Sequence, residues 1–313
     1  MSRHTSDDGL LLPGIDGTNP LGFLAALGVL ASLSRIDGLT SARMRWTLKN
    51  ATWVPCIMFD ASVSLTEDGL LDKLVTTLVN DRSRHPANLY EQLQDEVNSR
   101  RSFFETVVSD ASLTARARVD FLSAIASDAS PDDAVNQLQT TRRDYHLGNI
   151  DSILSATTRD HLLRTLFVAW DYSDPLNNQS LHLDPTEDRR HAYQWNKPSG
   201  DPSRNRVGGM LGANRLAIEA IALFTSFPRN SRLATVGFRG SRSHDTFWTW
   251  PIWGTSVSLD VAKTTLAIEE LQADEFDSST RKRLKAQGII AAYRTQRILV
   301  EKTPNFTPPY RVA

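Results

Sequence analysis

Two segments that should form helices with apolar residues on nearly every side most constrain how this chain can fold. The first covers residues 21–33; Asn19 before it is a good helix N-cap, and Pro20 suits the first helical position, where a missing N–H costs nothing. The second covers residues 210–224 and directly follows a Gly208-Gly209 pair. A helix without a polar face has to be buried all round, so we expect both helices at the centre of one core.

Glycine and polar residues interrupt these two helices at a few positions. Gly28 weakens the first helix, which indicates that another backbone approaches it closely there. Asn214, Arg215 and Glu219 interrupt the second helix, and buried polar groups need hydrogen-bond partners. We therefore expect these three side chains to hydrogen-bond the polar segment that precedes the second helix and to fix its path.

Short β-type stretches near both ends of the chain should complete the core. Residues 43–47 and 52–59 are predicted strands around a turn, and Pro55 in the second indicates an edge strand or a bulge. Further strands are predicted in the C-terminal third, at residues 232–239, 245–253 and 289–300. The prediction is an α+β fold, with a mixed sheet built from N- and C-terminal strands around the two buried apolar helices.

The chain of 313 residues suffices for one large domain or two ordinary ones. Within residues 86–154, apolar residues recur at helical spacing among dense charges, which predicts a helical subdomain. We therefore predict that residues 1–85 form the N-terminal α+β part of the core and residues 86–154 a helical insertion. Residues 155–313 would complete the core and carry a long central loop and a basic tail.

Charge and composition exclude several classes of protein. A net charge of −1 excludes a uniformly basic nucleic-acid binder, although it permits a local basic face. The single cysteine, Cys56, excludes an intramolecular disulfide framework and CxxC zinc sites. No export signal is recognised, and the apolar run at 21–33 is too short to span a bilayer. We expect a cytoplasmic protein without a membrane partner and without a cofactor.

A polar segment at residues 171–208 is where we expect function. It is rich in Pro, Asn, Ser and Arg, and loops of this length within a compact domain are usually functional or disordered. Aromatic residues such as Tyr193 and Trp195 favour burial, which argues against disorder. Loops held by a rigid scaffold commonly carry binding residues. The segment is therefore the first candidate for a binding surface.

The basic residues of this segment fit nucleic-acid recognition. Guanidinium groups bind phosphates bidentately, and aromatic rings stack on unpaired bases. In the alternative interpretation the two aromatic residues anchor the loop to the core, and the arginines pair with Asp184, Asp188 and Asp201. The residues predicted to bind nucleic acid here are Arg189, Arg190, Lys197, Arg204, Arg206, Tyr193 and Trp195.

The tail from residue 281 to residue 311 is strongly basic. It holds eight basic residues and one acidic residue, a local net charge of +7 in a chain of net charge −1, which favours a polyanionic partner. Within the strand predicted at 289–300, Arg294 and Arg297 are three positions apart and should lie on opposite faces. Both join the predicted nucleic-acid-binding set, together with Arg239 and Arg242.

The acidic side of the central segment permits a different chemistry. Divalent cations prefer carboxylate oxygens, so Asp184, Glu187, Asp188 and His191 are the weaker, alternative catalytic set of a metal-dependent nuclease. A simpler interpretation makes Asp184 an N-cap, Pro185 the first residue of a helix and Glu187 its capping-box partner. No spacing here is a diagnostic metal motif, so no metal is predicted.

Three groups of segments carry a resemblance to a known family. They are GIDGTNPLGFLAALGVL, then LHLDPTEDRRHAYQWNKPSGD with GGMLGANRLAIEAIALF, and FWTWPIWGTSVSLDVAKTTL. Together they resemble a bacterial CRISPR-associated protein family of type I-G (formerly I-U) interference loci, as a large-subunit-like or accessory subunit. The resemblance implies guide RNA, target DNA and other CRISPR-associated proteins as partners. In such complexes base pairing reads the sequence while protein holds the backbone.

Three functions therefore compete. The first is a non-enzymatic nucleic-acid-binding subunit of an RNA-guided antiviral complex. The second is a protein-protein docking subunit that touches no nucleic acid and presents the aromatic stretch at 247–253 to its partner. The third is a metal-dependent nuclease that uses the acidic residues at 184–191.

Overall fold

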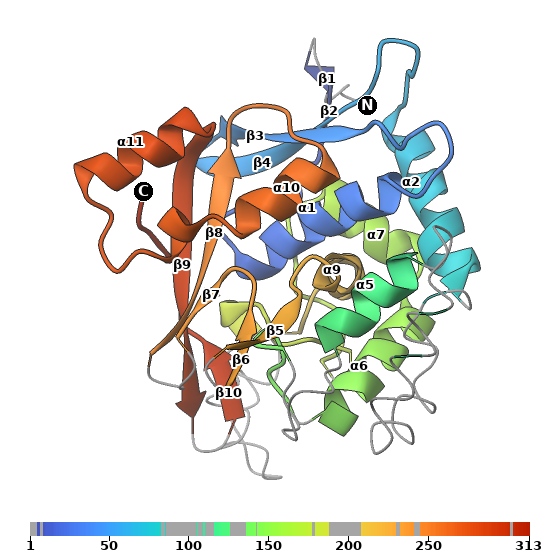
Figure 1. The fold of residues 1–313 in the computed structure, drawn as a ribbon. Helices are drawn as coiled ribbons and strands as arrows, with labels where there is room; N and C mark the ends of the chain where they lie inside the picture. The colour runs from blue at the N-terminus through green and yellow to red at the C-terminus, as the bar shows by residue number, and fades with distance from the viewer. Residues whose placement is uncertain are drawn as a thin grey trace.

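The α+β class predicted from the sequence is confirmed (Figure 1). The structure is a computed structural model in which helices cross the centre of the molecule and two sheets lie against them. The residues that the structure describes are 5–6, 9–82, 85, 105, 109, 116–125, 136–141, 143–176, 179–187, 208–229, 232–240, 245–300 and 303–313.

The two apolar helices are central and buried, as predicted. Helix α1 (Pro20–Leu33) is buried at every residue, and so is helix α9 (Leu211–Ile221). Asn19 is the N-cap of α1, because its side-chain oxygen accepts from the backbone N–H groups of Leu21 at 2.8 Å and Gly22 at 3.3 Å. The local pattern alone therefore located both helices.

The two central helices approach each other closely at Gly28. A Cβ atom at this position would overlap the carbonyl oxygen of Leu216 in α9, so only glycine fits. Gly212 of α9 has the same relationship to the carbonyl of His161 in helix α7 (Arg159–Phe167). The close approach predicted from Gly28 is confirmed, and α9 lies tightly between two neighbouring helices.

The strands form separate sheets rather than the single mixed sheet expected. Met44 in the N-terminal sheet forms an isolated antiparallel bridge with Val257, which lies just outside the strands of the C-terminal sheet. The N-terminal sheet has the order β1 (Thr5–Ser6), β2 (Gly9–Leu11), β4 (Thr52–Met58) and β3 (Arg43–Lys49). The C-terminal sheet has the order β10 (Thr303–Phe306), β9 (Ile289–Val300), β8 (Thr246–Trp253) and β7 (Phe238–Arg239), with β11 (Tyr310–Arg311) paired to β9. A separate hairpin joins β5 (Ser226–Arg229) to β6 (Arg232–Thr235), and every strand pair described is antiparallel.

An aromatic cluster binds both sheets to α1. The ring of Phe23 lies 5.9 Å from that of Trp46 in β3, and 6.0 and 6.1 Å from those of Trp250 and Trp253 in β8. The indole groups of Trp250 and Trp253 donate to backbone carbonyls of the N-terminal half, so their burial leaves no orphaned N–H. These contacts explain why two separate sheets share a core.

The same burial corrects one expectation about residues 247–253. The side chains of Trp248, Trp250, Ile252 and Trp253 are at most 1% exposed, so this stretch belongs to the core. Large aromatic side chains contribute most when they are fully removed from water, and here the core takes that contribution. The aromatic surface expected to dock another protein is not present on β8.

The described helices of the middle region pack on the same core. Phe121 of α5 (Arg116–Ile125) and Ile150 and Ile153 of α6 (Arg143–Ala156) share one hydrophobic cluster with α1 and α9. In Figure 1 both helices lie beside α9. The division at residues 85 and 154 stays a prediction. The other N-terminal helical elements are α2 (Glu67–Val75) and the π-helical turn η1 (Thr76–Asn80).

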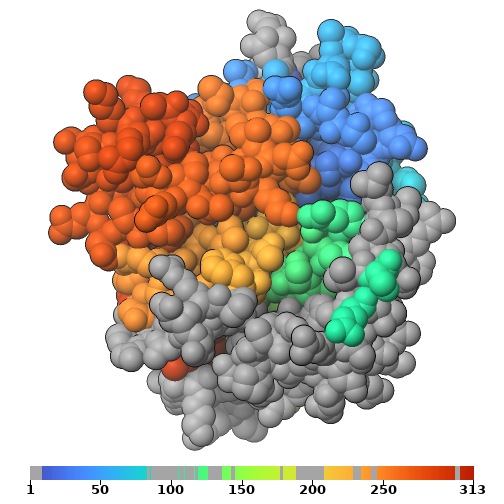
Figure 2. All heavy atoms as spheres, in the orientation of Figure 1, coloured from blue at the N-terminus to red at the C-terminus, as the bar shows by residue number. Residues whose placement is uncertain are grey.

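The C-terminal elements form one flank of the molecule, coloured orange to red in Figure 2. A second, small hydrophobic cluster of Leu271, Leu284, Ile289 and Ala292 holds this flank together. Among the described helices, none is long and apolar enough to cross a membrane. The helical elements of the flank are α10 (Leu259–Leu266), the 3₁₀ helix η7 (Glu269–Gln272) and α11 (Ser278–Ala286).

Candidate functional site

The described ends of the central segment meet at the N-terminal ends of α1 and α9. An antiparallel bridge joins Asp174 to Gly209, with N···O distances of 3.2 and 2.7 Å, and the Gly208 N–H donates to the Tyr172 carbonyl at 2.9 Å. The chain is therefore held together on both sides of residues 188–207. We call this junction the loop base, which consists of Asn19, Tyr172, Asp174, Ser180, His182, Asp184, Glu187 and Asn214.

Asp184 links the loop base to the cap of α1. Its Oδ1 accepts from the backbone N–H of Thr186 at 2.9 Å and from the Thr186 hydroxyl at 2.7 Å. Its Oδ2 accepts from the Asn19 amide at 2.9 Å and from the Tyr172 hydroxyl at 3.1 Å. The structure thus has Asp184 at the start of a short 3₁₀ helix, η6 (Pro185–Glu187), as the helix-start interpretation proposed.

Glu187 closes the base on the other side and is not a capping-box partner. Its carboxylate accepts from the Ser180 hydroxyl at 2.7 and 2.9 Å and faces His182 Nδ1 at 3.1 Å. A Cβ atom on Gly209 would lie 3.4 Å from Glu187 Oε1, so the two ends of the loop are neighbours. The predicted return of Glu187 to the helix start is wrong, because Ser180 and His182 already bind its oxygens.

Two residues of the loop base have strained backbone. Tyr172 and His182 have φ angles of 51° and 55°, in the left-handed region that residues with a Cβ rarely adopt. Such strain persists where surrounding contacts over-determine the conformation. Burial first, and then the negative charge of Asp184, raise the pKa of Tyr172 above its ordinary value, which keeps the phenol a hydrogen-bond donor.

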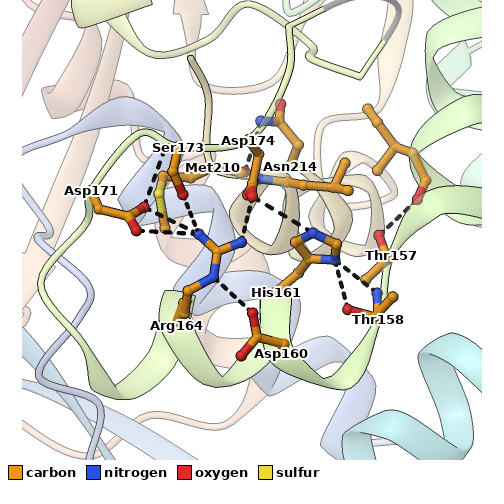
Figure 3. A network of polar contacts seen from close by, with 12 residues as sticks. Thr157, Thr158, Asp160, His161, Arg164, Asp171, Ser173, Asp174, Met210 and Asn214 are labelled. Atoms are coloured by element: carbon orange, nitrogen blue, oxygen red, sulfur yellow. Dashed lines mark hydrogen bonds and ion pairs between the residues drawn. The ribbon is translucent and has the colours of Figure 1, made fainter. Parts of the chain in front are cut away.

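Asp174 connects the base to α9 and α7 (Figure 3). One carboxylate oxygen accepts from the backbone N–H of Leu211, the first residue of α9, at 2.7 Å. The other oxygen pairs with the guanidinium of Arg164 and lies 3.6 Å from His161 Nε2. A carboxylate at a helix N-terminus also interacts favourably with the helix dipole. Asp174 therefore fixes where the loop ends and α9 begins.

His161 is oriented by the start of its own helix. The backbone N–H of Thr158 donates to its Nδ1 at 3.0 Å, as part of the capping box of α7. In the neutral imidazole the hydrogen is therefore on Nε2, which faces Asp174. Arg164 binds three further groups around it, the side chains of Asp160, Asp171 and Ser173, at 3.0, 3.1 and 2.7 Å. Each carboxylate of this network thus has a partner within the chain.

The polar residues of α9 divide into two groups. Asn214 accepts from the backbone N–H of Leu181 at 2.8 Å, so it hydrogen-bonds the polar segment as predicted. Arg215 and Glu219 do not; they pair with each other at 2.5 Å, and Glu219 also pairs with Arg35 after the end of α1 and with His85 at 3.3 Å. These two side chains hold α1 and the chain after η1, rather than the central loop.

This second network is strongly electrostatic. Burial alone would raise the pKa of Glu219, but Arg35, Arg215 and His85 outweigh it and hold that pKa well below its ordinary value. Burial lowers the pKa of His85, although Glu219 opposes the shift. The network is therefore built from an ionised Glu219 and a neutral His85.

The structure brings two residues of the predicted acidic set together, Asp184 and Glu187, and gives both internal hydrogen-bond donors. Within the residues that the structure describes, no group of His, Cys, Asp and Glu could hold a metal ion. Asp188 and His191 lie outside the described residues.

The structure places three residues of the predicted basic set. Arg239 pairs with the Asp274 carboxylate and lies 4.9 Å over the Phe247 ring. Arg294 is 3% exposed, and its guanidinium donates hydrogen bonds to Thr249 and to the Ala273 carbonyl. Arg297 is only partly buried. The set lying outside the described residues is Arg189, Arg190, Tyr193, Trp195, Lys197, Arg204, Arg206 and Arg242.

Sequence reasoning missed three contributors to the loop base. Asn19 was identified as a helix cap, but its bond to Asp184 has no local signal. Tyr172 and Ser180 carry none either, because their roles depend on a left-handed backbone and on contacts made by folding. The patterns that pointed to this junction were the LDPTE stretch at 183–187 and the polar interruption of the second helix at Asn214.

Comparison with known proteins gives no family. The chain matches no protein-family model, and a search of curated proteins likewise finds no match.

The chemistry of the loop base is that of a structural support: its carboxylates accept from hydroxyl, amide and guanidinium groups of the chain itself.

Proposed function

We propose that the chain is a non-enzymatic nucleic-acid-binding subunit that contacts its ligand through residues 188–207. One observation carries the proposal: acidic and basic residues are segregated along the central segment. Asp171, Asp174, Asp184 and Glu187 all have partners at or beside the loop base. Residues 188–207 contain five basic residues and two acidic residues, a net charge of +3.

This segregation weakens the alternative account of the loop arginines. In that account they pair with Asp184, Asp188 and Asp201. The oxygens of Asp184 already accept from Asn19, Tyr172 and Thr186, and the residue is 4% exposed. With Asp184 engaged, Asp188 and Asp201 are too few to neutralise the segment. An excess of guanidinium groups with two aromatic residues suits phosphates and unpaired bases.

The resemblance to type I-G CRISPR-associated proteins supports a more specific proposal. The segments that carry it contain Asn19 and α1, the 181–187 side of the loop base, and α9. These segments include Asn19, His182, Asp184, Glu187 and Asn214 of the loop base. We propose a cytoplasmic subunit or accessory factor of an RNA-guided antiviral complex. Its partners would be guide RNA or target DNA together with other CRISPR-associated proteins.

The direct test is a binding measurement with matched charge removal. Fluorescence anisotropy with single-stranded RNA, single-stranded DNA and duplex DNA would compare the wild type with Arg189→Gln/Arg190→Gln. The control is Arg43→Gln/Lys49→Gln, which removes the same charge from exposed positions of β3, outside the basic tail. We expect only the loop variant to weaken binding, with the slope of log K against log salt falling by about 2. Equal binding by the loop variant and the wild type would contradict the proposal.

A further inference from the structure

Two arginines on strand β9 have different surroundings. They lie on opposite faces of the strand: Arg294 reaches the carbonyls at the end of η7, whereas Arg297 reaches the segment 136–141. The guanidinium of Arg294 donates to Thr249 Oγ1 at 2.9 Å and to the carbonyls of Ala273 and Leu271 at 2.7 and 3.2 Å. Arg294 is thus fully used in holding the C-terminal flank together.

The guanidinium of Arg297 has fewer hydrogen-bond partners than that of Arg294. In the register of the sheet, Arg297 lies opposite Thr246 of β8 and Phe306 of β10. Its side chain is on the same face of β9 as those of Tyr293 and Thr295. One Nη donates to the Gln139 carbonyl at 3.0 Å, while Nε is buried without a hydrogen-bond partner. Within the described residues, no carboxylate pairs with this guanidinium. Burial lowers the pKa of Arg297 to about 10.

A charged group with so few hydrogen bonds would be stabilised by an anion. Buried charges in proteins are paired or hydrogen-bonded, because removing a charge from water without compensation is strongly unfavourable. Although Nε is buried, Arg297 as a residue keeps some exposure to solvent, the side from which an anion would approach. We propose that Arg297 binds a phosphate group, an inference that, for a nucleic-acid phosphate, rests on the proposed function.

The position of Arg297 connects it with the loop base. Gln139, which accepts from Arg297, precedes Thr140, and the Thr140 hydroxyl donates to the Leu181 carbonyl at 2.8 Å. The Leu181 N–H in turn donates to Asn214 of the loop base. A phosphate on Arg297 would therefore be bound next to the elements that support residues 188–207. A planar guanidinium suits the tetrahedral oxygens of phosphate better than a lysine ammonium does.

Thermal unfolding with inorganic phosphate tests the site directly. The proteins are the full chain, Arg297→Met and a control, Arg281→Met, which removes an equal charge from α11. Phosphate is compared with chloride at equal ionic strength. We expect phosphate to raise the Tm of the wild type and the control but not that of Arg297→Met. Without phosphate, Arg297→Met should be at least as stable as the wild type, because it removes a buried charge that has no acidic partner among the described residues. An equal gain in all three proteins would overturn the proposal.

Binding of a short single-stranded oligonucleotide distinguishes the two sources of phosphate. If the backbone supplies it, Arg297→Met binds several-fold more weakly and the salt slope falls by about 1. An unchanged slope, together with a phosphate-dependent Tm in the wild type, assigns the site to a free phosphate compound. The two proposals fail separately: Arg189→Gln/Arg190→Gln tests the loop by binding, whereas the Tm of Arg297→Met with inorganic phosphate involves no nucleic acid.

Discussion

Asn19 and Asp184 are joined by a 2.9 Å hydrogen bond across 165 residues of sequence. The same asparagine accepts from the first N–H groups of α1 through its side-chain oxygen. One side chain thus caps a fully buried helix and holds the start of the central loop. The loop base is consequently as firmly positioned as the core itself.

Substitutions at Asn19 should separate these two roles. Asn19→Ser keeps a good N-cap but loses the amide donor to Asp184, whereas Asn19→Ala loses both. We expect Asn19→Ala to lower the free energy of unfolding by about 1–3 kcal/mol and Asn19→Ser by less. Chemical denaturation measures both values. Equal losses would mean that the bond to Asp184 contributes nothing beyond the cap.

Removal of divalent cations should leave stability unchanged. Asp184 and Glu187 accept hydrogen bonds from the chain itself, so neither carboxylate needs a metal ion. We expect the same Tm in EDTA and in magnesium chloride at equal ionic strength. Asp184→Ala should lower the free energy of unfolding by about 1–3 kcal/mol in both conditions, since it leaves donors without an acceptor. A magnesium-dependent rise in Tm that Asp184→Ala abolishes would instead favour the nuclease alternative.

Gly28→Ala should be strongly destabilising. The added Cβ would overlap the Leu216 carbonyl oxygen and force α1 and α9 apart, at a cost of about 1–3 kcal/mol or more. Gly69→Ala in α2 is the control, since its Cβ would meet the flexible side chain of Leu65 at 3.1 Å. Alanine also favours the helix there by about 0.5–1 kcal/mol, so this change should be close to neutral. A near-neutral Gly28→Ala would show that α1 and α9 can separate without penalty.

Acid should destabilise the protein through the network around Glu219. The pKa of His85 and that of Glu219 are both lower in the folded protein than their ordinary values of 6.5 and 4.5. The unfolded chain therefore binds more protons, and stability falls as the pH drops, first below about 6.5 through His85 and then below about 4.5 through Glu219.

His85→Gln isolates the upper part of this pH dependence. The groups that face His85 are Glu219, Arg215 and Arg35, and glutamine can still donate to Glu219 without titrating. We expect the free energy of unfolding of this variant to vary less between pH 7 and pH 5 than that of the wild type. Urea denaturation at each pH makes the comparison. Identical pH profiles would assign the acid sensitivity to other groups.

Arg294→Met should destabilise the C-terminal flank. The change leaves the carbonyls of Leu271 and Ala273 and the hydroxyl of Thr249 without their donor. We expect a loss of about 2–4 kcal/mol in the free energy of unfolding. Arg297→Met, on the other face of the same strand, is the matched comparison and should lose nothing. If Arg294→Met were also neutral, its buried hydrogen bonds would have no net effect on folding.

Strong local patterns explain which parts of the fold were predictable. Asn19 and Pro20 located the start of α1, and the largely apolar sequence of α9 indicated its burial despite three polar residues. Pro55 misled, because β4 lies between β2 and β3 rather than at an edge. The Pro55 carbonyl accepts from the Leu12 N–H, and a residue's N–H and C=O leave a strand on the same side. The missing N–H therefore costs no bond to β3.

Non-local contacts explain what the sequence could not reveal. Strands from the two ends of the chain were expected in one sheet, but they form separate sheets. The sheets meet through the rings of Trp46 and Trp253, which pack on Phe23 and on each other. At the candidate site, the pattern around Asp184 was sufficient to predict a helix start. The partners of Glu187 come from Ser180 and His182, which no helical spacing connects with it.

The neighbouring positions of Glu187 and Gly209 have a consequence for how such a protein can diversify. The two ends of the intervening stretch are already held together. The entropic cost of closing this loop therefore grows only with the logarithm of its length, so residues can be inserted or exchanged there at little cost. Mutations there would be free of the constraints that fix the helix cap and the aromatic core. New ligand preferences could then arise on an inherited scaffold, with recognition and folding under separate selection.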